Sequence, residues 1–422
     1  MPSGSIPRRL VLVLGLLFAA NFLNYIDRGN LSIAAPILQQ ELGISPQKLG
    51  LLLSAFFWTY ALLQPVAGWV VDRFDVAYVL AAGFLTWSAA TAATGMVHAY
   101  ATLFAVRLAL GIGESVAYPS YARIIARGVS ESRRGIANAV VGAGILLGPG
   151  FGIFAGGNLI SKFGWRPFFV VLGLGSMVWL PMWLAAMPRE PRQPAPPAPT
   201  SPAAGAITLR QFLSLRAAWG ACGGHFAHNY FSYFMITWLP YYLERECGFS
   251  PYRMARVGAL AYLLAAVACT SAGWLADRWI EDGGDSNFIR KFCLGGGLAA
   301  SAMFLFGAAF AGRAASPAML VLATAVFGVT SSHVFVAAQT LAGPQAAGRW
   351  TGMQNFAGNL AGPVAPALTG FLFQRTGNFT AAFAVTSAIL LFGTFCWCVV
   401  LKRIEPVDWE ARRPGALASR DN

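Results

Sequence analysis

The sequence predicts an all-α membrane protein of twelve transmembrane helices, arranged as two pseudo-symmetric bundles of six. Of the 422 residues, 56% are hydrophobic and only 11% are charged, whereas about a quarter of the residues of soluble domains are charged. Apolar stretches of about 18 to 25 residues recur along the chain, and each is long enough to cross a hydrocarbon core as a helix. A proline-rich segment separates six such stretches from six more.

A membrane β-barrel is excluded, because its strands would alternate apolar and polar residues over about ten positions. The stretches 10–20 and 379–401 are apolar on every face instead. The first stretch follows two arginines, as the core of a secretory signal does, yet it runs into Asn24 and Asp27 without a small-residue cleavage site. We therefore expect it to be retained as the first helix.

The N-terminal bundle is expected to cover residues 1–187. An arginine cluster at 123–134 separates its fourth and fifth spans, and the Phe163-Gly164 turn precedes its sixth. The expected spans are 10–29, 49–71, 76–97, 101–122, 135–158 and 167–187.

Residues 188–211 are expected to form a linker, because its many prolines and small residues cannot build a packed helix and favour extended, solvated chain. The C-terminal bundle follows at 212–401, and residues 402–422 form a tail. The expected spans of this bundle are 212–243, 256–277, 290–311, 316–341, 349–374 and 379–401.

The distribution of arginines predicts the orientation. Clusters at 8–9, 123–134, 189–192 and 402–413 fall on one side if the helix count is even throughout, and the positive-inside rule makes that side the cytoplasm. Both termini and the linker are then cytoplasmic, in a bacterial cytoplasmic membrane. The formal charge of +13 does not indicate nucleic-acid binding, because the basic residues form no continuous patch. We expect a monomer in the lipid bilayer.

No metal or cofactor is expected. The six cysteines lack metal-finger spacing, and a zinc site at His225 and His228 with the distant His333 would need a further ligand. No nucleotide-binding loop of the type G-x-x-x-x-G-K-[ST] occurs in the sequence, so ATP is not the expected energy source. The cysteines lie at positions 222, 247, 269, 293, 396 and 398.

An internal repeat supports the two-bundle organisation. The segment 68–73, Gly-Trp-Val-Val-Asp-Arg, recurs at 273–278 as Gly-Trp-Leu-Ala-Asp-Arg, about half a chain later. Duplicated six-helix halves are a transporter architecture, and the G-x-x-x-D-R pattern resembles the signature loop of the major facilitator superfamily. The resemblance covers essentially the whole chain. It implies gating loops that contain Asp72, Arg73, Asp277 and Arg278.

The first of these loops departs from the family pattern. The family loop usually continues with glycine and further basic residues, whereas Phe74, Asp75 and Val76 follow here. We therefore expect its gating charge network to be reduced or rewired.

Three further segments resemble the anion:cation symporter family, which includes bacterial sugar-acid transporters and the vesicular glutamate and sialic acid carriers. These are Asn24-Tyr-Ile-Asp-Arg-Gly-Asn-Leu31, then Arg107-Leu-Ala-Leu-Gly-Ile-Gly-Glu-Ser-Val-Ala-Tyr-Pro119, and the segment from His225-Phe-Ala-His-Asn229 to Leu239-Pro240. The resemblance implies transport of an organic anion, and the second segment discriminates best.

Four charged residues lie inside the first and fourth spans. A charge at the bilayer centre costs at least about 2.5 to 3.5 kcal/mol, so such residues are functional candidates. Arg107, our first choice, and Arg28 could each hold a carboxylate through two parallel hydrogen bonds. Asp27 and Glu114 could carry the coupled proton, because hydration and neighbouring charges control their protonation. Alternatively, these residues form interhelical ion pairs that only fix the packing.

Uncharged polar residues complete the predicted site. Tyr60 and Gln64 lie four apart on one helical face, as do Asn355 and Asn359, and Tyr25 precedes the charged pair of the first span. These side chains suit a polyhydroxylated acid, although interfacial anchoring or contacts between helices would also explain them. The histidines His225 and His228 could donate to an anion or share a proton, or could equally be helix contacts.

The leading hypothesis is therefore a proton-coupled symporter of a small organic anion such as a sugar acid, which works by alternating access. An antiporter that exports a drug-like compound or exchanges a phosphorylated anion is the second hypothesis. A membrane receptor or enzyme would need a sizeable sensing domain or a catalytic set, and the sequence offers neither.

Overall fold

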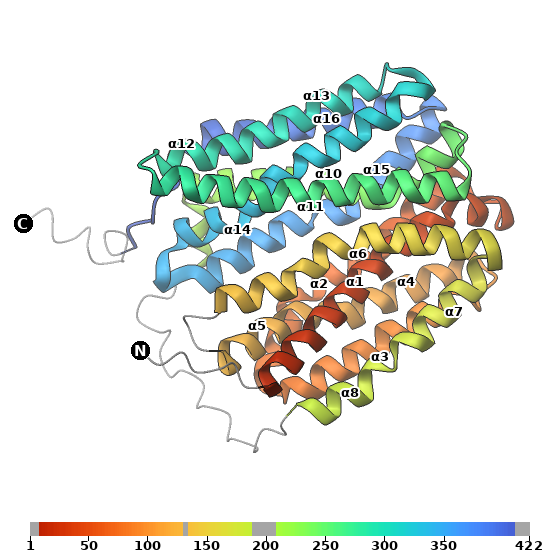
Figure 1. Cartoon of the computed structure of the whole chain (residues 1–422), viewed down its shortest axis with the longest axis horizontal. Helices are drawn as coiled ribbons and strands as arrows, with labels where there is room; N and C mark the ends of the chain where they lie inside the picture. The colour runs from red at the N-terminus through yellow and green to blue at the C-terminus, as the bar shows by residue number, and fades with distance from the viewer. Residues whose placement is uncertain (1–7, 130–133, 188–207, 410–422) are drawn as a thin grey trace, which may run out of the picture.

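The computed structural model describes residues 8–129, 134–187 and 208–409, and in these ranges the regular secondary structure is entirely helical. Most of the helices run along the long axis of the molecule in two bundles, with α1 to α8 in one and α10 to α16 in the other (Figure 1). The all-α prediction is confirmed. Most of the expected linker, at 188–207, and the tail beyond 409 lie outside the described residues.

The N-terminal bundle contains six spans, two of which are interrupted helices. The fourth span combines α4 with α5, and the sixth combines α7 with α8. Side-chain caps begin α2 and α3, where Ser45 and Asp75 accept hydrogen bonds from backbone N–H groups of the first turn. The helices are α1 Arg8–Glu41, α2 Pro46–Arg73, α3 Val76–Thr94, α4 Tyr100–Ser115, α5 Ala117–Gly128, α6 Arg134–Phe163, α7 Trp165–Ser176 and α8 Trp179–Ala186.

The C-terminal bundle also contains six spans. The long element α14 supplies one whole span and the beginning of the next, because Gly343 within it has φ +65° and ψ 174° and the chain turns there. The helices are α9 Leu209–Leu213, α10 Arg216–Tyr241, α11 Pro251–Glu281, α12 Ser286–Lys291, α13 Gly297–Ala308, α14 Gly312–Asn359, α15 Ala361–Thr376 and α16 Thr380–Phe395, with π-helical turns at Tyr242–Glu246, Phe292–Gly296 and Cys396–Val400.

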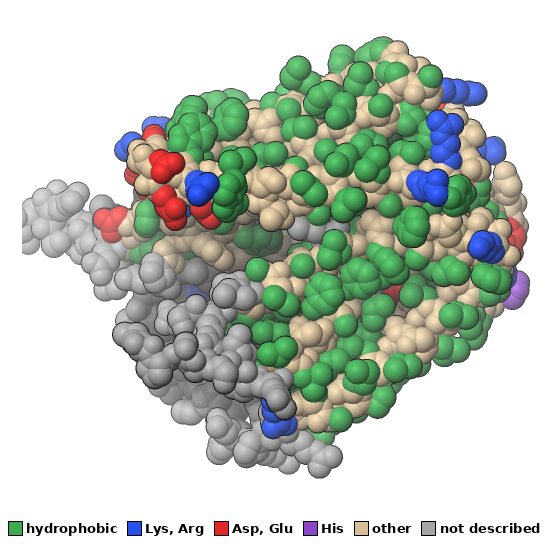
Figure 2. All heavy atoms as spheres, in the orientation of Figure 1, with side chains coloured by type: hydrophobic (Ala, Val, Ile, Leu, Met, Phe, Trp, Pro, Cys, Tyr) green, Lys and Arg blue, Asp and Glu red, His purple; other side chains and the backbone are tan. Residues whose placement is uncertain are grey.

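The twelve-helix prediction is confirmed. Eleven helices among the described residues are long and apolar enough to cross a membrane, and the 26-residue α10 is the twelfth. Hydropathy alone misses α10 because it carries histidine, asparagine and serine side chains toward the space between the bundles. The surface matches a bilayer, since hydrophobic side chains cover the middle and most charged ones lie at the two ends (Figure 2).

Two expectations about element boundaries are wrong. The first helix continues to Glu41 rather than ending at residue 29, because the polar and charged residues between Asn24 and Asn30 interrupt the apolar run, which resumes after them within the same helix. The Asp-Arg motifs lie on helices rather than in loops. Arg73 ends α2, whereas Asp277 and Arg278 belong to α11, which continues for another three residues. The side chain of Asp72 lies outside the described part.

The side that carries Arg8, Arg73 and Trp409 is called here the terminal side, and the opposite end is the far side (Figure 1). At the far side the two bundles are in direct contact. The Tyr241 hydroxyl of α10 donates to Gln39 Oε1 of α1 at 2.6 Å, and the backbone N–H of Gln47 donates to Gln374 Oε1 at 3.1 Å.

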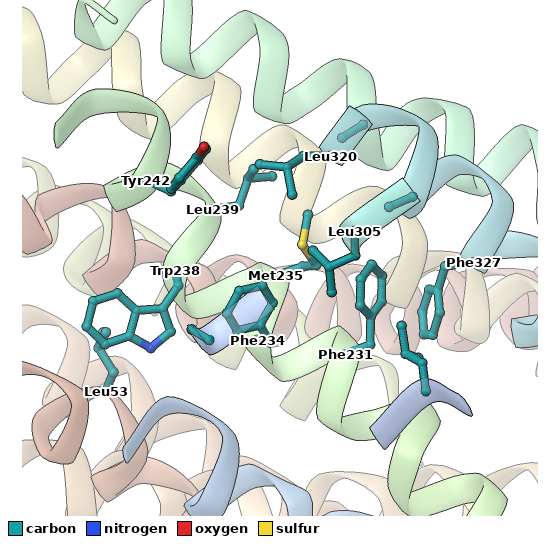
Figure 3. Packing of buried hydrophobic residues seen from close by; sticks show 14 of the residues in the cluster. Leu53, Phe231, Phe234, Met235, Trp238, Leu239, Tyr242, Leu305, Leu320 and Phe327 are labelled. Carbon is teal, nitrogen blue, oxygen red and sulfur yellow. The ribbon is translucent and has the colours of Figure 1, made fainter. Parts of the chain in front are cut away.

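Small residues bring the bundles together at this end. A Cβ on Gly50 of α2 would lie 2.6 Å from the Pro366 carbonyl oxygen and 3.0 Å from the Gly370 Cα, so the two backbones are in contact. Nearby, Leu53 of α2 lies against Trp238 of α10, where the core of the C-terminal bundle begins (Figure 3). The far side is therefore closed by tight packing.

We predict that Gly50→Ala weakens this closure. The added methyl group cannot fit without separating α2 from α15, and overpacking of this kind costs about 1–3 kcal/mol, which corresponds to a shift of about ten-fold toward a conformation open at the far side. The readout is the rate at which an impermeant maleimide labels a cysteine introduced at Gln39, in a cysteine-free background in lipid nanodiscs.

Gly68→Ala on the same helix is the control, because a Cβ there meets nothing within 4 Å. Equal labelling rates for the two variants would contradict the proposed role of the Gly50 contact.

Candidate substrate cavity

A cavity of about 1030 Å³ lies between the two bundles. Leu209, Trp219 and Arg349 line it near the terminal side, and the first two are 62% and 59% exposed. The far-side contacts close its other end, so the cavity opens toward the terminal side alone. Eight of the nine residues that the sequence analysis assigns to substrate binding line it, namely Tyr25, Arg28, Tyr60, Gln64, His225, His228, Asn355 and Asn359.

A buried ion pair lies at the wall that the N-terminal bundle contributes. Arg28 Nε of α1 donates to Glu114 Oε2 of α4 at 3.0 Å, and the two side chains are 2% and 0% exposed. Arg28 Nη2 has no hydrogen-bond partner among the described residues. The ion pair thus occupies Nε and leaves Nη2 as a buried donor that needs a further partner.

Aromatic rings hold the Arg28 guanidinium in place. Its Cζ lies 4.4 Å from the ring centroid of Tyr60, 4.6 Å from that of Tyr25 and 5.2 Å from that of Phe56. The faces of these rings attract the cation and exclude water from it. Both tyrosines line the cavity, so they also offer hydroxyl groups beside the charged pair.

The other two predicted charges lie behind this wall. Arg107 is 2% exposed, and its Cζ lies 5.5 Å from the Phe56 ring, on which Arg28 also packs. Asp27 is 3% exposed, accepts a hydrogen bond from Asn30 and interacts with the Arg107 charge. Neither residue lines the cavity in this conformation, whereas the sequence analysis ranks Arg107 first for the anion.

Polar side chains of the N-terminal bundle extend the site. Gln64 lines the cavity, and its Nε2 has no partner among the residues that the structure describes. Tyr118 of α5 also lines the cavity and interacts with the Tyr25 hydroxyl. The amide of Gln64 can therefore donate to a substrate oxygen without first breaking a protein contact.

The asparagine pair of the C-terminal bundle is divided between packing and the cavity. The Tyr233 hydroxyl donates to Asn359 Oδ1 at 2.5 Å, and Asn359 Nδ2 donates to the Asn355 carbonyl at 2.8 Å. Asn359 thus joins α10 to α14, as the packing alternative requires, although it lines the cavity. The Tyr233 ring also packs on Phe57 of the N-terminal bundle, with centroids 4.3 Å apart.

The two histidines lie on the cavity wall of α10. The His228 ring stacks on Phe327 with centroids 4.3 Å apart, and its Nδ1 has no partner within the described ranges. His225 Nδ1 lies 3.4 Å from Gln354 Nε2, and the Trp350 indole N–H donates to the Oε1 of the same Gln354 at 2.9 Å.

Sequence reasoning missed several of these residues. Gln354 and Trp350 form a helical i, i+4 pair, which is a detectable pattern, but their link to His225 spans 129 residues. Tyr118 lies inside the segment that resembles the symporter family and could have been singled out. Arg349 follows the break at Gly343, and no periodic pattern in the sequence predicts that break.

Comparisons with known proteins find relatives that match this chain over most of its length. The family model of the Major Facilitator Superfamily matches residues 17–366. A chloroplastic ascorbate transporter of Arabidopsis thaliana is 32% identical over 413 residues, which cover 93% of this chain and 74% of that protein. A probable sulfoacetate transporter of Cupriavidus necator is 30% identical over 396 residues, which cover 90% and 91%.

Two further similarities extend across nearly whole chains. The hexuronate transporter of Bacillus subtilis is 27% identical over 411 residues, which cover 95% of this chain and 97% of that protein. A solved structure of a bacterial homologue of the human lysosomal transporter Spinster superposes with a TM-score of 0.72 at 20% identity, covering 94% and 95% of the two chains. This last likeness concerns the fold.

We predict that the Arg28 and Glu114 substitutions are strongly non-additive in stability. Removal of one partner of a buried ion pair costs about 3–5 kcal/mol, because the other charge is left uncompensated, while replacing both partners is much less costly. The thermal unfolding temperature in detergent should therefore fall more for Arg28→Met or Glu114→Gln than for the double variant.

The ion pair between Glu41 and Arg166 is the control, since its side chains are 40% and 25% exposed and exposed pairs contribute about 0–1 kcal/mol. Losses that simply add in the Arg28 and Glu114 series would contradict the prediction.

Proposed function

This chain belongs to the major facilitator superfamily, and we propose that it carries small organic anions across a membrane together with protons. It is a transporter and not an enzyme. The substrates in its relatives' names, ascorbate, sulfoacetate and hexuronate, are all organic acids that are anionic near neutral pH. A cavity between two bundles, open at one side and closed by packing at the other, supports alternating access.

The observation that carries the proposal is the position of Arg28. Its side chain is buried, belongs to a residue of the cavity lining and has one donor, Nη2, without a partner among the described residues. A buried donor of this kind costs free energy unless a ligand satisfies it. A carboxylate or sulfonate oxygen would satisfy it, and the rings of Tyr25 and Tyr60 pack on the same guanidinium.

Glu114 supplies the coupling to protons. A substrate anion at Arg28 would place a second negative charge on a guanidinium that already pairs with Glu114. Protonation of Glu114 removes that repulsion, so binding of the anion and binding of the proton promote each other. Return of Glu114 to its charged form restores the ion pair and expels the anion.

Asp27 and Arg107 are a second carboxyl and a second cation, and both respond to the change of charge at Glu114. Asp27 interacts with both Glu114 and Arg107, so a change of charge at Glu114 alters the field at Asp27. We assign Asp27 to the proton pathway. Arg107 then balances the charge behind the cavity wall rather than binding the anion in this conformation.

The C-terminal bundle binds the rest of the substrate. Apart from Arg349 near the terminal side, the polar side chains that line that wall carry no permanent charge, and they include His225, His228, Asn229, Ser232 and Asn355. Such groups suit hydroxyl and carbonyl oxygens. With the charged pair on the opposite wall, the cavity fits a small acid with one anionic end, such as a sugar acid.

The terminal side is the cytoplasmic side in this proposal, because the arginine clusters flank the helix ends there. The structure then corresponds to the inward-open conformation of a transporter in a bacterial cytoplasmic membrane. The alternative is an antiporter, which would use the same cavity to exchange or export its substrate.

We expect an inward proton gradient to drive uptake of an organic anion into proteoliposomes. The panel is D-glucuronate, D-gluconate, L-ascorbate and sulfoacetate, each labelled and tested with and without the gradient. Glu114→Gln should abolish accumulation driven by the gradient but retain exchange of the anion, because a neutral side chain mimics the protonated carrier and cannot release its proton.

Glu41→Gln is the matched control, since Glu41 lies at the far-side end of α1, outside the cavity. Gradient-driven accumulation that survives in Glu114→Gln would remove Glu114 from the coupling mechanism. No uptake of any anion under any gradient would overturn the symporter proposal and favour an exporter.

We also expect Arg28→Lys to raise the KM for the transported anion by about ten- to a hundred-fold. Lysine keeps the charge but loses the planar fork, and a hydrogen bond to a charged group contributes about 1.5–3 kcal/mol. Arg107→Lys should raise KM less, because Arg107 does not line the cavity. A larger increase of KM in Arg107→Lys than in Arg28→Lys would indicate that Arg107 binds the anion.

A further inference from the structure

We propose that Gln354 is a positioning residue that fixes the proton of His225 on Nε2, so that His225 presents a hydrogen-bond donor to the substrate. The tautomer follows from the contacts alone, whereas its use in substrate binding rests on the proposed function. Three side chains form the relay, from Trp350 to Gln354 on α14 and from there to His225 on α10.

The orientation of the Gln354 amide is determined by Trp350. An indole N–H can only donate, and it lies 2.9 Å from Gln354 Oε1. If the amide were flipped, its NH₂ group would face the indole N–H, and two donors would be in contact. Trp350 is 0% exposed and Gln354 is 1% exposed, so water cannot relieve such a contact. The oxygen of Gln354 therefore faces Trp350, and its nitrogen faces His225.

The Gln354 nitrogen in turn determines the tautomer of His225. It lies 3.4 Å from His225 Nδ1, and an amide nitrogen has no acceptor capacity. Nδ1 must therefore be the acceptor and carry no proton. The neutral imidazole then has its proton on Nε2, and a doubly protonated ring is disfavoured because its Nδ1–H would point at another donor.

Packing restricts the orientation of the His225 ring. A Cβ on Gly358 would lie 2.9 Å from both Cγ and Cδ2 of His225, so the α14 backbone lies directly on that edge of the ring. Phe335 packs edge-on at a centroid distance of 5.6 Å. His225 is 2% exposed and lines the cavity, and Nε2 is the ring nitrogen that Gln354 does not occupy.

The consequence for the substrate is a fixed polarity on the wall opposite Arg28. An Nε2–H group donates a hydrogen bond to a hydroxyl, carbonyl or ring oxygen. It cannot pair with an ammonium group, which is also a donor. The transported acid should thus carry an acceptor oxygen at the end remote from its charge, and zwitterionic amino acids are disfavoured there.

The relay also reaches the terminal side of the molecule. The Trp350 ring packs edge-on against Phe212 of α9 at 5.0 Å and lies 6.1 Å from the ring of Trp409. The Trp409 indole N–H donates to the Ala342 carbonyl at 2.8 Å, beside the break in α14. Packing at the cavity mouth therefore holds Trp350, and through Gln354 it holds the histidine.

The test is nitrogen NMR of the full-length protein in lipid nanodiscs, with ¹⁵N-labelled histidine near neutral pH. Ring nitrogens with and without a proton differ widely in chemical shift, and the signals of His225 are those lost in His225→Gln. Wild type should show a protonated Nε2 and an unprotonated Nδ1. Gln354→Glu, a substitution of equal size whose carboxylate only accepts, should move the proton to Nδ1.

Trp350→Phe provides a second variant, because it removes the N–H that orients Gln354 and should give a mixture of tautomers. Gln64→Glu is the control, since it adds the same acid to the same cavity from α2 and should leave the His225 tautomer unchanged. A protonated Nδ1 in wild type would overturn the proposal. An equal response to Gln354→Glu and Gln64→Glu would also overturn it, by assigning the effect to the added charge.

The measurement needs no substrate, so its outcome does not depend on the transport assays. If the NMR spectra show the expected tautomer but no anion is taken up, the proposed function fails and this inference stands. If anions are taken up but the tautomer differs, this inference fails and the proposed function stands.

Discussion

The ion pair between Arg28 and Glu114 is the constraint on which the rest of the structure depends. Two charges that are 2% and 0% exposed are tolerated in a membrane protein only if each compensates the other. Their side chains meet although the residues are 86 positions apart, and although α1 packs mainly on α6 while α4 packs mainly on α2 and α3. The aromatic rings around the guanidinium exclude water, and this makes the pair sensitive to any further charge in the cavity. Desolvation raises the free-energy cost of burying the pair, and for the same reason the pair interacts strongly with an anion that enters the cavity.

An ion pair that interacts with an anion in this way is useful to a transporter only if the cavity can open to either side. Part of the far-side closure consists of small residues, as the backbone approach of Gly50 to Gly370 illustrates. Interfaces of small residues pack without interlocking side chains, so the bundles can separate without large rearrangement inside either one. In contrast, the aromatic core along α10 is continuous from Tyr242 to Phe231 (Figure 3). The C-terminal bundle therefore has a continuous aromatic core, and the small-residue contacts between α2 and α15 are where the bundles separate with the least repacking.

The sequence was sufficient for the helical class, the twelve spans and eight residues of the cavity lining, and physical reasons explain where it failed. Apolar length predicts a span because the bilayer imposes it, but the charged residues inside α1 hid the continuation of that helix to Glu41. Charge inside a span identified Asp27, Arg28, Arg107 and Glu114 as a group. It could not decide which arginine faces the cavity, because that depends on the rotation of α1 and α4 about their axes. The link from Gln354 to His225 was equally out of reach, since both residues are ordinary members of polar helix faces until the fold places them in contact.

The two walls of the cavity differ in a way that follows from their chemistry. On one wall, a charged pair can change its net charge by one proton, so it can report whether an anion is present. On the other, the Tyr233 and Asn359 contact and the relay through Gln354 fix neutral groups in one orientation. Neutral groups with fixed donors discriminate by shape and hydrogen bonding but do not respond strongly to protons. In the proposed mechanism, coupling and specificity therefore reside on opposite bundles, and a substrate must contact both walls to be recognised and to be coupled. Under that proposal the carrier does not let protons pass without an anion, since Glu114 gains its proton together with the ligand that the other wall has selected.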